Sequence, residues 1–182
     1  PDHLPEDARL YGFDLDIATK VHTDILERLN SEGVQTADVR AAMLDAPEDD
    51  LAFFKADFHW TARGAMEAAI EIADLIQAHP DYADLEKTTY ETVPIGPETA
   101  FSGMRRMLQK KCKYSLPEPI TMTYATKAVE SLDLSTGSGG LDLFGSDDDR
   151  IAVALLGTSF SDSPINNFPG FLAQYSGLEV VN

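Results

Sequence analysis

Apolar side chains recur at helical spacing in two stretches of the first half of the chain. Between residues 14 and 31 an apolar position falls at every fourth residue, which predicts an amphipathic helix. A second helix is predicted from its N-cap Thr61 to about Ala78, because Pro80 forbids much continuation. The apolar positions are Ile17, Val21, Ile25 and Leu29 in the first helix, and Ala65, Ala69, Ile72 and Ile76 in the second.

The segments around these helices have weaker patterns. Residues 34–39 read as a short strand, followed by a short helical or irregular piece through Leu44, and a helix followed by a strand is typical of an α/β domain. Strand-like pieces at 88–95 and 120–126 flank a basic stretch. Residues 131–150 are rich in Gly, Ser and Asp and predict a loop or a loose hairpin.

The last part of the chain has the clearest pattern. Residues 151–156 are wholly apolar, as expected of a strand buried on both faces of a parallel sheet. Apolar positions at i, i+3, i+4 and i+7 then predict a short helix over 168–175, closed by Gly177, and residues 178–181 begin another strand. This is a βαβ unit, and ligands in such sheets bind at the carboxyl ends of strands, where Ser159 falls.

Length and composition describe one ordinary domain. The chain has 182 residues, of which 43% are hydrophobic, so we expect a single domain over residues 1–182. No stretch approaches the roughly 20 apolar residues that cross a bilayer, so no membrane span is predicted. The acidic, proline-rich start lacks the pattern of a signal peptide, and a first residue other than methionine suggests a fragment of a larger protein.

Charge and cysteine content limit the possible partners. A net charge of −17 argues against binding of nucleic acid. Five of the 14 basic residues fall within 105–113, which indicates either a solvated face or a landing site for carboxylates. The single cysteine, Cys112, excludes an internal disulfide, and the acidic residues at 142 and 147–149 lack the spacing of a calcium loop, so we predict no metal site.

One serine and one histidine stand out as candidate catalytic residues. Ser159 would need a base to take its proton, and His59 lies two residues from Asp57 in "ADFHWT". In an extended segment these two side chains point the same way, so the carboxylate could orient the imidazole. An Asp-x-His turn can equally serve as a cap or as a pair of metal ligands, and spacing alone leaves these alternatives open.

Taken together, the motifs resemble a known family. "DFHWT", the helix start Arg63-Gly64-Ala65, "LFG" and "GTSFS" are similar to the catalytic domain of the alginate O-acetyltransferases of the AlgX and AlgJ type, over about residues 13–182. The resemblance implies an SGNH-hydrolase-like α/β/α sandwich of three layers with a mainly parallel sheet. It also implies Ser159 as nucleophile, His59 as general base and acid, and Asp57 as the carboxylate that orients it.

The resemblance further implies an O-acetyltransferase that moves an acetyl group through an acetyl-serine to hydroxyls of an exopolysaccharide. It implies a periplasmic setting, a membrane-bound acyltransferase that delivers the acetyl group, and no cofactor. Four residues are candidates for substrate binding. Trp60 could stack on a sugar ring, Arg63 and Arg105 could meet uronate carboxylates or the acetyl oxyanion, and Asn167 could donate to the oxyanion or cap the following helix.

Two other functions fit the same residues. An acetylesterase with the same triad would use water as the acceptor, and a non-catalytic polysaccharide-binding module would keep the motif for structure alone. A metal-dependent hydrolase built on Asp57 and His59 lacks an apparent third ligand. The acidic composition also leaves the identity of the polysaccharide open.

Overall fold

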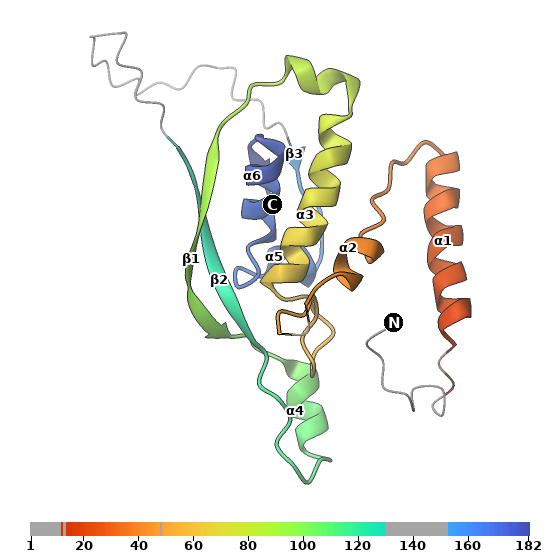
Figure 1. Cartoon of the computed structure of the whole chain (residues 1–182), viewed down its shortest axis with the longest axis vertical. Helices are drawn as coiled ribbons and strands as arrows, with labels where there is room; N and C mark the ends of the chain where they lie inside the picture. The colour runs from red at the N-terminus through yellow and green to blue at the C-terminus, as the bar shows by residue number, and fades with distance from the viewer. Residues whose placement is uncertain (1–11, 13, 48, 130–152) are drawn as a thin grey trace.

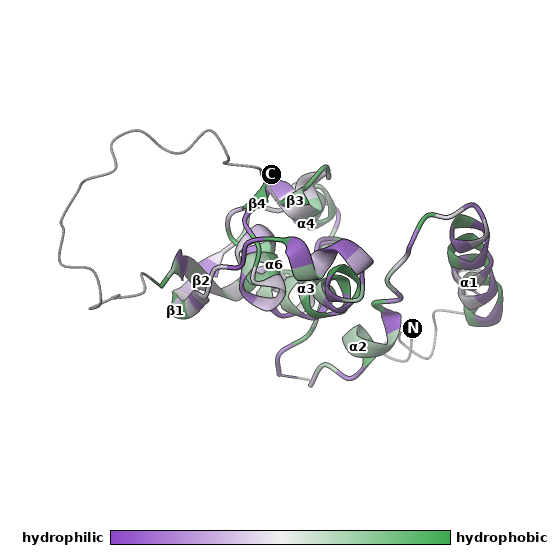
Figure 2. Ribbon diagram, turned by 90° about the horizontal axis from the view of Figure 1, so that it is seen from above, coloured by the Kyte–Doolittle hydropathy of each residue, from purple (hydrophilic) through white to green (hydrophobic). Residues whose placement is uncertain are grey.

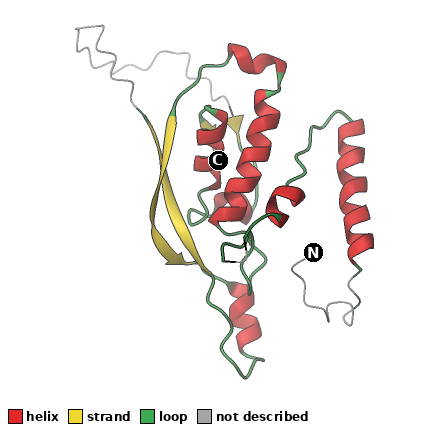
Figure 3. Ribbon diagram, in the orientation of Figure 1, coloured by secondary structure: helices red, strands yellow, loops and turns green. Residues whose placement is uncertain are grey.

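The computed structural model of the 182-residue chain describes residue 12 and residues 14–47, 49–129 and 153–182. Figures 1 and 3 show its helices and strands. In chain order they are α1 (Leu15–Ser31), α2 (Arg40–Leu44), α3 (Ala62–Gln77), the 3-10 helix η2 (Pro80–Asp84), β1 (Tyr90–Thr99), α4 (Gly103–Gln109), β2 (Ile120–Ala128), β3 (Val153–Ala154), α5 (Ser159–Asp162), α6 (Phe168–Ser176) and β4 (Val180–Val181).

The core lies between α3 and α6. The predicted helix at 62–77 is confirmed, with Thr61 as its N-cap, whose hydroxyl accepts the Gly64 N–H at 3.3 Å. One face of α3 consists of alanines, which lets the aromatic face of α6 pack closely against it. The buried cluster comprises Ala62, Ala65, Ala68, Ala69, Ala73, Phe168, Phe171 and Leu172.

Helix α6 lies between two small sheets. β1 and β2 form an antiparallel ribbon from Tyr90↔Ala128 to Thr99↔Ile120, with a register shift between Pro94 and Gly96. β3 and β4 pair in parallel, Val153 opposite Val180. α6 contacts the ribbon as well as β4, so the two sheets lie on different sides of the helix (Figure 1).

The βαβ unit of the C-terminal part is confirmed, since β3 and β4 are parallel and α6 connects them. The burial expected for its first strand is wrong. Among the described residues of this predicted strand, 153–156, Val153 and Ala154 pair with β4; Ala154 is exposed and Leu156 is 96% exposed. The strand therefore has one covered face. In the described residues both sheets have two strands, and the mainly parallel sheet of a three-layer sandwich stays a prediction.

The strand predicted at residues 34–39 is absent, whereas the helical piece that follows it is α2. The Asn30 side chain at the end of α1 takes up hydrogen bonds of this segment. Its amide donates to Thr36 Oγ1 at 2.7 Å and accepts from the Thr36 N–H at 3.2 Å. The Asn30 side chain thus accepts a backbone N–H, that of Thr36, which a strand would have used to pair with a neighbouring strand. The loop or hairpin predicted at 131–150 lies outside the described residues.

Helix α1 confirms the first predicted helix but has none of its residues buried. Its N-cap Asp14 accepts the Ile17 N–H at 3.1 Å. Its four apolar positions are between 40% and 62% exposed. Figure 2 shows α1 standing apart from the rest of the described chain. Along the described ranges, no helix has both the length and the apolar character that crossing a membrane requires.

Candidate active site

The three predicted catalytic residues lie in one hydrogen-bonded chain. Asp57 and His59 belong to the loop before α3, and Ser159 is the first residue of α5. His59 Nδ1 lies 2.5 Å from Asp57 Oδ1, and His59 Nε2 lies 2.8 Å from Ser159 Oγ. The fold has therefore joined side chains that are one hundred residues apart.

A tight loop gives Asp57 and His59 their orientation. Phe53 and Trp60 face each other across an antiparallel bridge, and the Phe54 N–H donates to the His59 carbonyl at 3.3 Å. Helix α3 begins directly against this loop. A Cβ at Gly64 would overlap the Ala52 carbonyl oxygen, so the close approach depends on a glycine.

Asp57 is held as a carboxylate. Its side chain is only 4% exposed, and its Oδ1 also accepts the His59 backbone N–H at 2.9 Å. Its Oδ2 accepts the hydroxyl of Ser102. Burial raises the pKa of the Asp57 carboxyl, but the hydrogen bonds from Ser102 and from the backbone and ring of His59 together lower it below the ordinary value of 3.8.

This arrangement fixes the tautomer of His59. An ionised Asp57 only accepts hydrogen bonds, so Nδ1 carries the ring proton and Nε2 has the free lone pair. Nε2 can then accept the proton of the Ser159 hydroxyl. The His59 side chain is 24% exposed and Ser159 is exposed, so a substrate can reach both.

The turn that carries Ser159 is built from short-range hydrogen bonds. The Thr158 carbonyl accepts the N–H groups of Ser161 and Asp162 at 3.0 and 3.1 Å, and the Ser161 hydroxyl at 3.0 Å. A Cβ at Gly157 would overlap Ser161 Oγ. The glycine two residues before Ser159 thus leaves room for the Ser161 side chain in this turn.

Aromatic rings join the two halves of the site. Phe58 and Phe160 lie beside the His59 ring at 4.1 and 5.1 Å between centroids. Trp60 packs against Phe160 and Phe168, and its Nε1–H donates to the Phe160 carbonyl at 2.8 Å. Trp60 therefore connects the loop of His59 to the turn that carries Ser159, and it is half-buried.

Two predicted substrate-binding residues, Arg63 and Arg105, already have partners within the chain. Arg63 pairs with Glu67 at 2.6 Å and lies 3.8 Å from Asp50. Arg105 donates to the carbonyls of Leu116 and Pro117 at 2.7 to 3.3 Å. The two side chains are partly exposed, at 29% and 20%, so each has a structural contact and retains some access to solvent.

Asn167 is the fourth predicted substrate-binding residue. It stands at the N-cap of α6 in the left-handed region (φ 53°), and its side chain makes no capping hydrogen bond. Its amide instead donates to Thr126 Oγ1 on β2 at 3.0 Å. Asn167 thus lies where the capping hypothesis placed it, but it links α6 to the ribbon.

Ser102 is a site residue that sequence reasoning missed. It is 6% exposed, lies 45 positions after Asp57, and directly contacts the Asp57 carboxylate. No motif marks it. The one available signal was its place ahead of the basic stretch as an N-cap serine of a short helix.

No cluster of three or more potential metal ligands occurs within the part of the chain that the structure describes. The acidic residues at 142 and 147–149 lie outside that part. The chemistry visible at the site is that of a serine, a histidine and a carboxylate.

A family model described as "SGNH hydrolase-like domain, acetyltransferase AlgX" matches residues 1–182. The chain belongs to this family.

Relatives and solved structures agree with this assignment. The alginate biosynthesis protein AlgX of Pseudomonas aeruginosa is 30% identical over 171 residues, which are 94% of this chain and 34% of that protein. The probable alginate O-acetylase AlgJ of the same organism is 28% identical over 191 residues, 98% of this chain and 48% of that protein. The chain thus spans between about one third and one half of these relatives.

The structure of P. aeruginosa AlgX superposes with a TM-score of 0.76 at 26% identity, covering 96% of this chain and 38% of that one. The O-acetyltransferase domain of Pseudomonas putida AlgJ gives 0.68 at 23% identity, covering 92% of this chain and 52% of that one, and supports the fold alone. The SGNH-hydrolase-like α/β fold expected for this AlgX-type chain is therefore confirmed.

Proposed function

We propose that this AlgX-type chain carries a serine O-acetyltransferase site that transfers acetyl groups to hydroxyls of an exopolysaccharide such as alginate. The single observation that carries the proposal is the position of His59, with one ring nitrogen on Asp57 and the other on Ser159. Membership in the AlgX family supports the transferase activity and the alginate-like acceptor, since relatives are named for alginate biosynthesis and O-acetylation.

The reaction has two half-steps. His59 Nε2 takes the Ser159 proton while Oγ attacks the acetyl carbonyl, and the imidazolium, paired with Asp57, then protonates the leaving group. A sugar hydroxyl next gives its proton to His59 as its oxygen attacks the acetyl-serine. His59 returns a proton to Ser159 Oγ, which regenerates the enzyme and releases the acetylated sugar.

The setting is also part of the proposal. A chain of this family would act on polysaccharide in the periplasm and receive its acetyl group from a membrane-bound acyltransferase, without a cofactor. Trp60, Arg63, Arg105 and Asn167 remain candidates for acceptor binding. Any contact of theirs with substrate would add to the intramolecular contacts described above.

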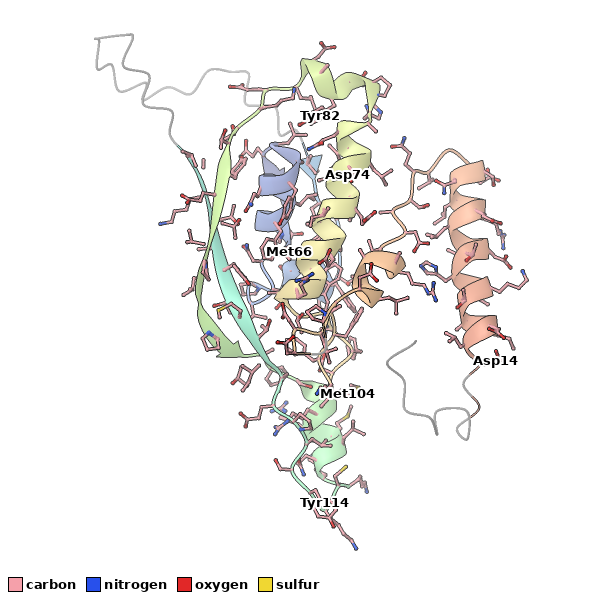
Figure 4. All side chains as sticks on the ribbon, in the orientation of Figure 1. Asp14, Met66, Asp74, Tyr82, Met104 and Tyr114 are labelled. Carbon is pink, nitrogen blue, oxygen red and sulfur yellow. The ribbon has the colours of Figure 1, made fainter. Side chains whose placement is uncertain are left out.

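The basic stretch supplies a candidate route for an anionic acceptor. It folds as α4 and the turn after it, at one end of the molecule (Figure 1), and Figure 4 shows Tyr114 at the tip of this end. Arg106 lies over the Phe101 ring at 4.4 Å, and Tyr114 is 85% exposed. Ser102, the N-cap of α4, touches Asp57, so the basic end begins beside the triad.

An acetylesterase is the second candidate, and the exposure of Ser159 favours it. A site open to solvent admits water as the acceptor, and the same three residues would then hydrolyse acetyl esters. Water and sugar compete for one acetyl-serine, so the two functions differ in the partition of this intermediate.

The test is turnover of p-nitrophenyl acetate by the intact chain and by Ser159→Ala, His59→Ala and Asp57→Ala. We expect activity in the intact chain and a loss of about 10³-fold or more in the serine and histidine variants. Oligomannuronate is then added. Acetylated sugar detected by mass spectrometry supports the transferase, whereas acetate alone supports the esterase. An intact chain no faster than its Ser159→Ala variant contradicts both.

A further inference from the structure

Ser102 occupies a position next to the triad that no motif indicated. Its hydroxyl oxygen accepts the Arg105 N–H at 2.9 Å, as an N-cap of α4 should. The same hydroxyl donates to Asp57 Oδ2. Ser102 is 6% exposed and Asp57 is 7% exposed, so water does not compete freely for either group.

The hydroxyl has one proton, and its alternatives are poor. The other acceptor within reach is the Ala56 carbonyl at 3.4 Å, which is the longer contact. The Arg105 N–H donates to a lone pair of the hydroxyl oxygen, so the hydroxyl proton is free for the nearer acceptor, the Asp57 carboxylate. A hydrogen bond to a charged acceptor is stronger than a neutral one.

Each carboxylate oxygen of Asp57 therefore has its own hydrogen-bond partners. Oδ1 serves His59, through both its ring and its backbone N–H, and Oδ2 serves Ser102. A carboxylate with one fixed oxygen could still rotate about its Cβ–Cγ bond. With both oxygens held, the plane of the group is set, and the His59 ring is set with it.

We infer that Ser102 is a positioning residue, which extends the triad to a hydrogen-bonded chain of four residues: Ser102, Asp57, His59 and Ser159. It acts through Asp57 and does not touch substrate. The inference rests on the proposed catalytic function of the triad. In the part of the chain that the structure describes, His59 is the ionisable group in contact with Asp57, so Ser102 and His59 share the control of this carboxylate.

A purely structural role for Ser102, as the cap of α4, makes different predictions. Three substitutions separate the roles. Ser102→Ala removes both the cap and the donor. Ser102→Gly removes the donor but remains an adequate cap, because glycine is well tolerated at this position. Ser102→Thr keeps both functions. Asp14→Ala, which removes the N-cap of α1, is the matched control for loss of a cap elsewhere.

The first readout is steady-state turnover of p-nitrophenyl acetate. We expect kcat to fall about tenfold or more in Ser102→Ala and Ser102→Gly, with KM changed less than about twofold, because the loss lies in orientation and not in binding. Ser102→Thr restores most of kcat, and Asp14→Ala keeps the full value. If the glycine variant retains full kcat, or the threonine variant loses as much as the alanine variant, the inference is wrong.

The second readout does not depend on activity. The Asp57 carboxyl carbon is followed by NMR as pH is lowered, with Asp57→Asn for assignment. Loss of the Ser102 donor should raise the pKa of Asp57, since burial is then opposed by fewer hydrogen bonds. An unchanged titration in Ser102→Ala overturns the inference. An inactive intact chain would overturn the proposed function instead, and the titration would still decide whether Ser102 holds the carboxylate.

Discussion

Helices α1 and α3 are both amphipathic, yet only one of them belongs to the core. In α3 six residues are buried, five of them alanines, and α6 packs along them. In α1 no residue is buried, and Ile17, the first of its four apolar positions, is 62% exposed.

An apolar stripe predicts that a helix forms, but it does not predict that the helix will be buried. Both stripes repeat at helical spacing, and both helices formed where the pattern predicted them. The stripe of α3 meets aromatic side chains from α6, far along the chain, whereas that of α1 meets no comparable partner among the described residues. Periodicity therefore identifies a face that would bury well but does not identify its partner.

The sharpest test of the packed region is Phe171→Ala on α6. Phe171 is 2% exposed and packs in the alanine cluster of α3, so its loss leaves a cavity. We expect the free energy of unfolding to fall by about 3–5 kcal/mol, measured by urea titration. A loss below about 1 kcal/mol would contradict the assignment of the core to the packing of α6 on α3.

A second test concerns the contact between α3 and the histidine loop. Gly64→Ala would drive a methyl group into the Ala52 carbonyl, so we expect about 1–3 kcal/mol of destabilisation together with slower turnover of p-nitrophenyl acetate. Gly103→Ala at the start of α4 is the control, because its Cβ meets nothing within 4 Å. Equal stability of the two variants would show that the loop relaxes around the added methyl.

A third effect appears only in acid. Asp57 has a lowered pKa in the folded chain, so its ionisation contributes stability that is complete above the unfolded value of 3.8 and is lost as pH falls through the folded value. The midpoints of thermal unfolding of the intact chain and of Asp57→Asn, plotted against pH, should therefore converge below pH 3.8. Parallel curves down to the lowest pH measured would contradict the lowered pKa.

The smallest effect is expected on α1. Ile25 is 51% exposed, so Ile25→Ser should change the free energy of unfolding by no more than about 0.5 kcal/mol. Size-exclusion chromatography of the intact chain and of Ile25→Ser, compared by elution volume, provides the control. A large loss of stability or a change in elution volume would show that the stripe is covered in solution, and the contrast with α3 would disappear.

Local patterns predicted the elements that depend on near neighbours. The helices at 14–31 and 61–78, the helix at 168–175 and the parallel βαβ unit were correct, because caps, glycines and apolar spacing act over a few residues. The strand at 34–39 was wrong. Its polar Thr36 is bonded to the Asn30 side chain, a contact that apolar spacing cannot reveal.

The residues of the candidate site likewise fall into those that local patterns predicted and those that depend on tertiary contacts. Asp57 and His59 were paired from their spacing, and Ser159 from its place after a strand, and the structure brings all three together. Ser102 was missed because its approach to Asp57 depends on how the segment between α3 and α4 returns to the loop. The partners of Arg105, the carbonyls of Leu116 and Pro117, likewise depend on tertiary structure.

The hydrogen bond from Trp60 to the Phe160 carbonyl has a consequence for the order of folding. His59 and Ser159 belong to segments one hundred residues apart, and closing so long a loop is slow compared with forming the helices themselves. Trp60 is the only tryptophan and sits at that joint. Its fluorescence during refolding therefore reports the moment at which the two segments meet, and catalytic competence should arise with that signal and not with the earlier gain of helix.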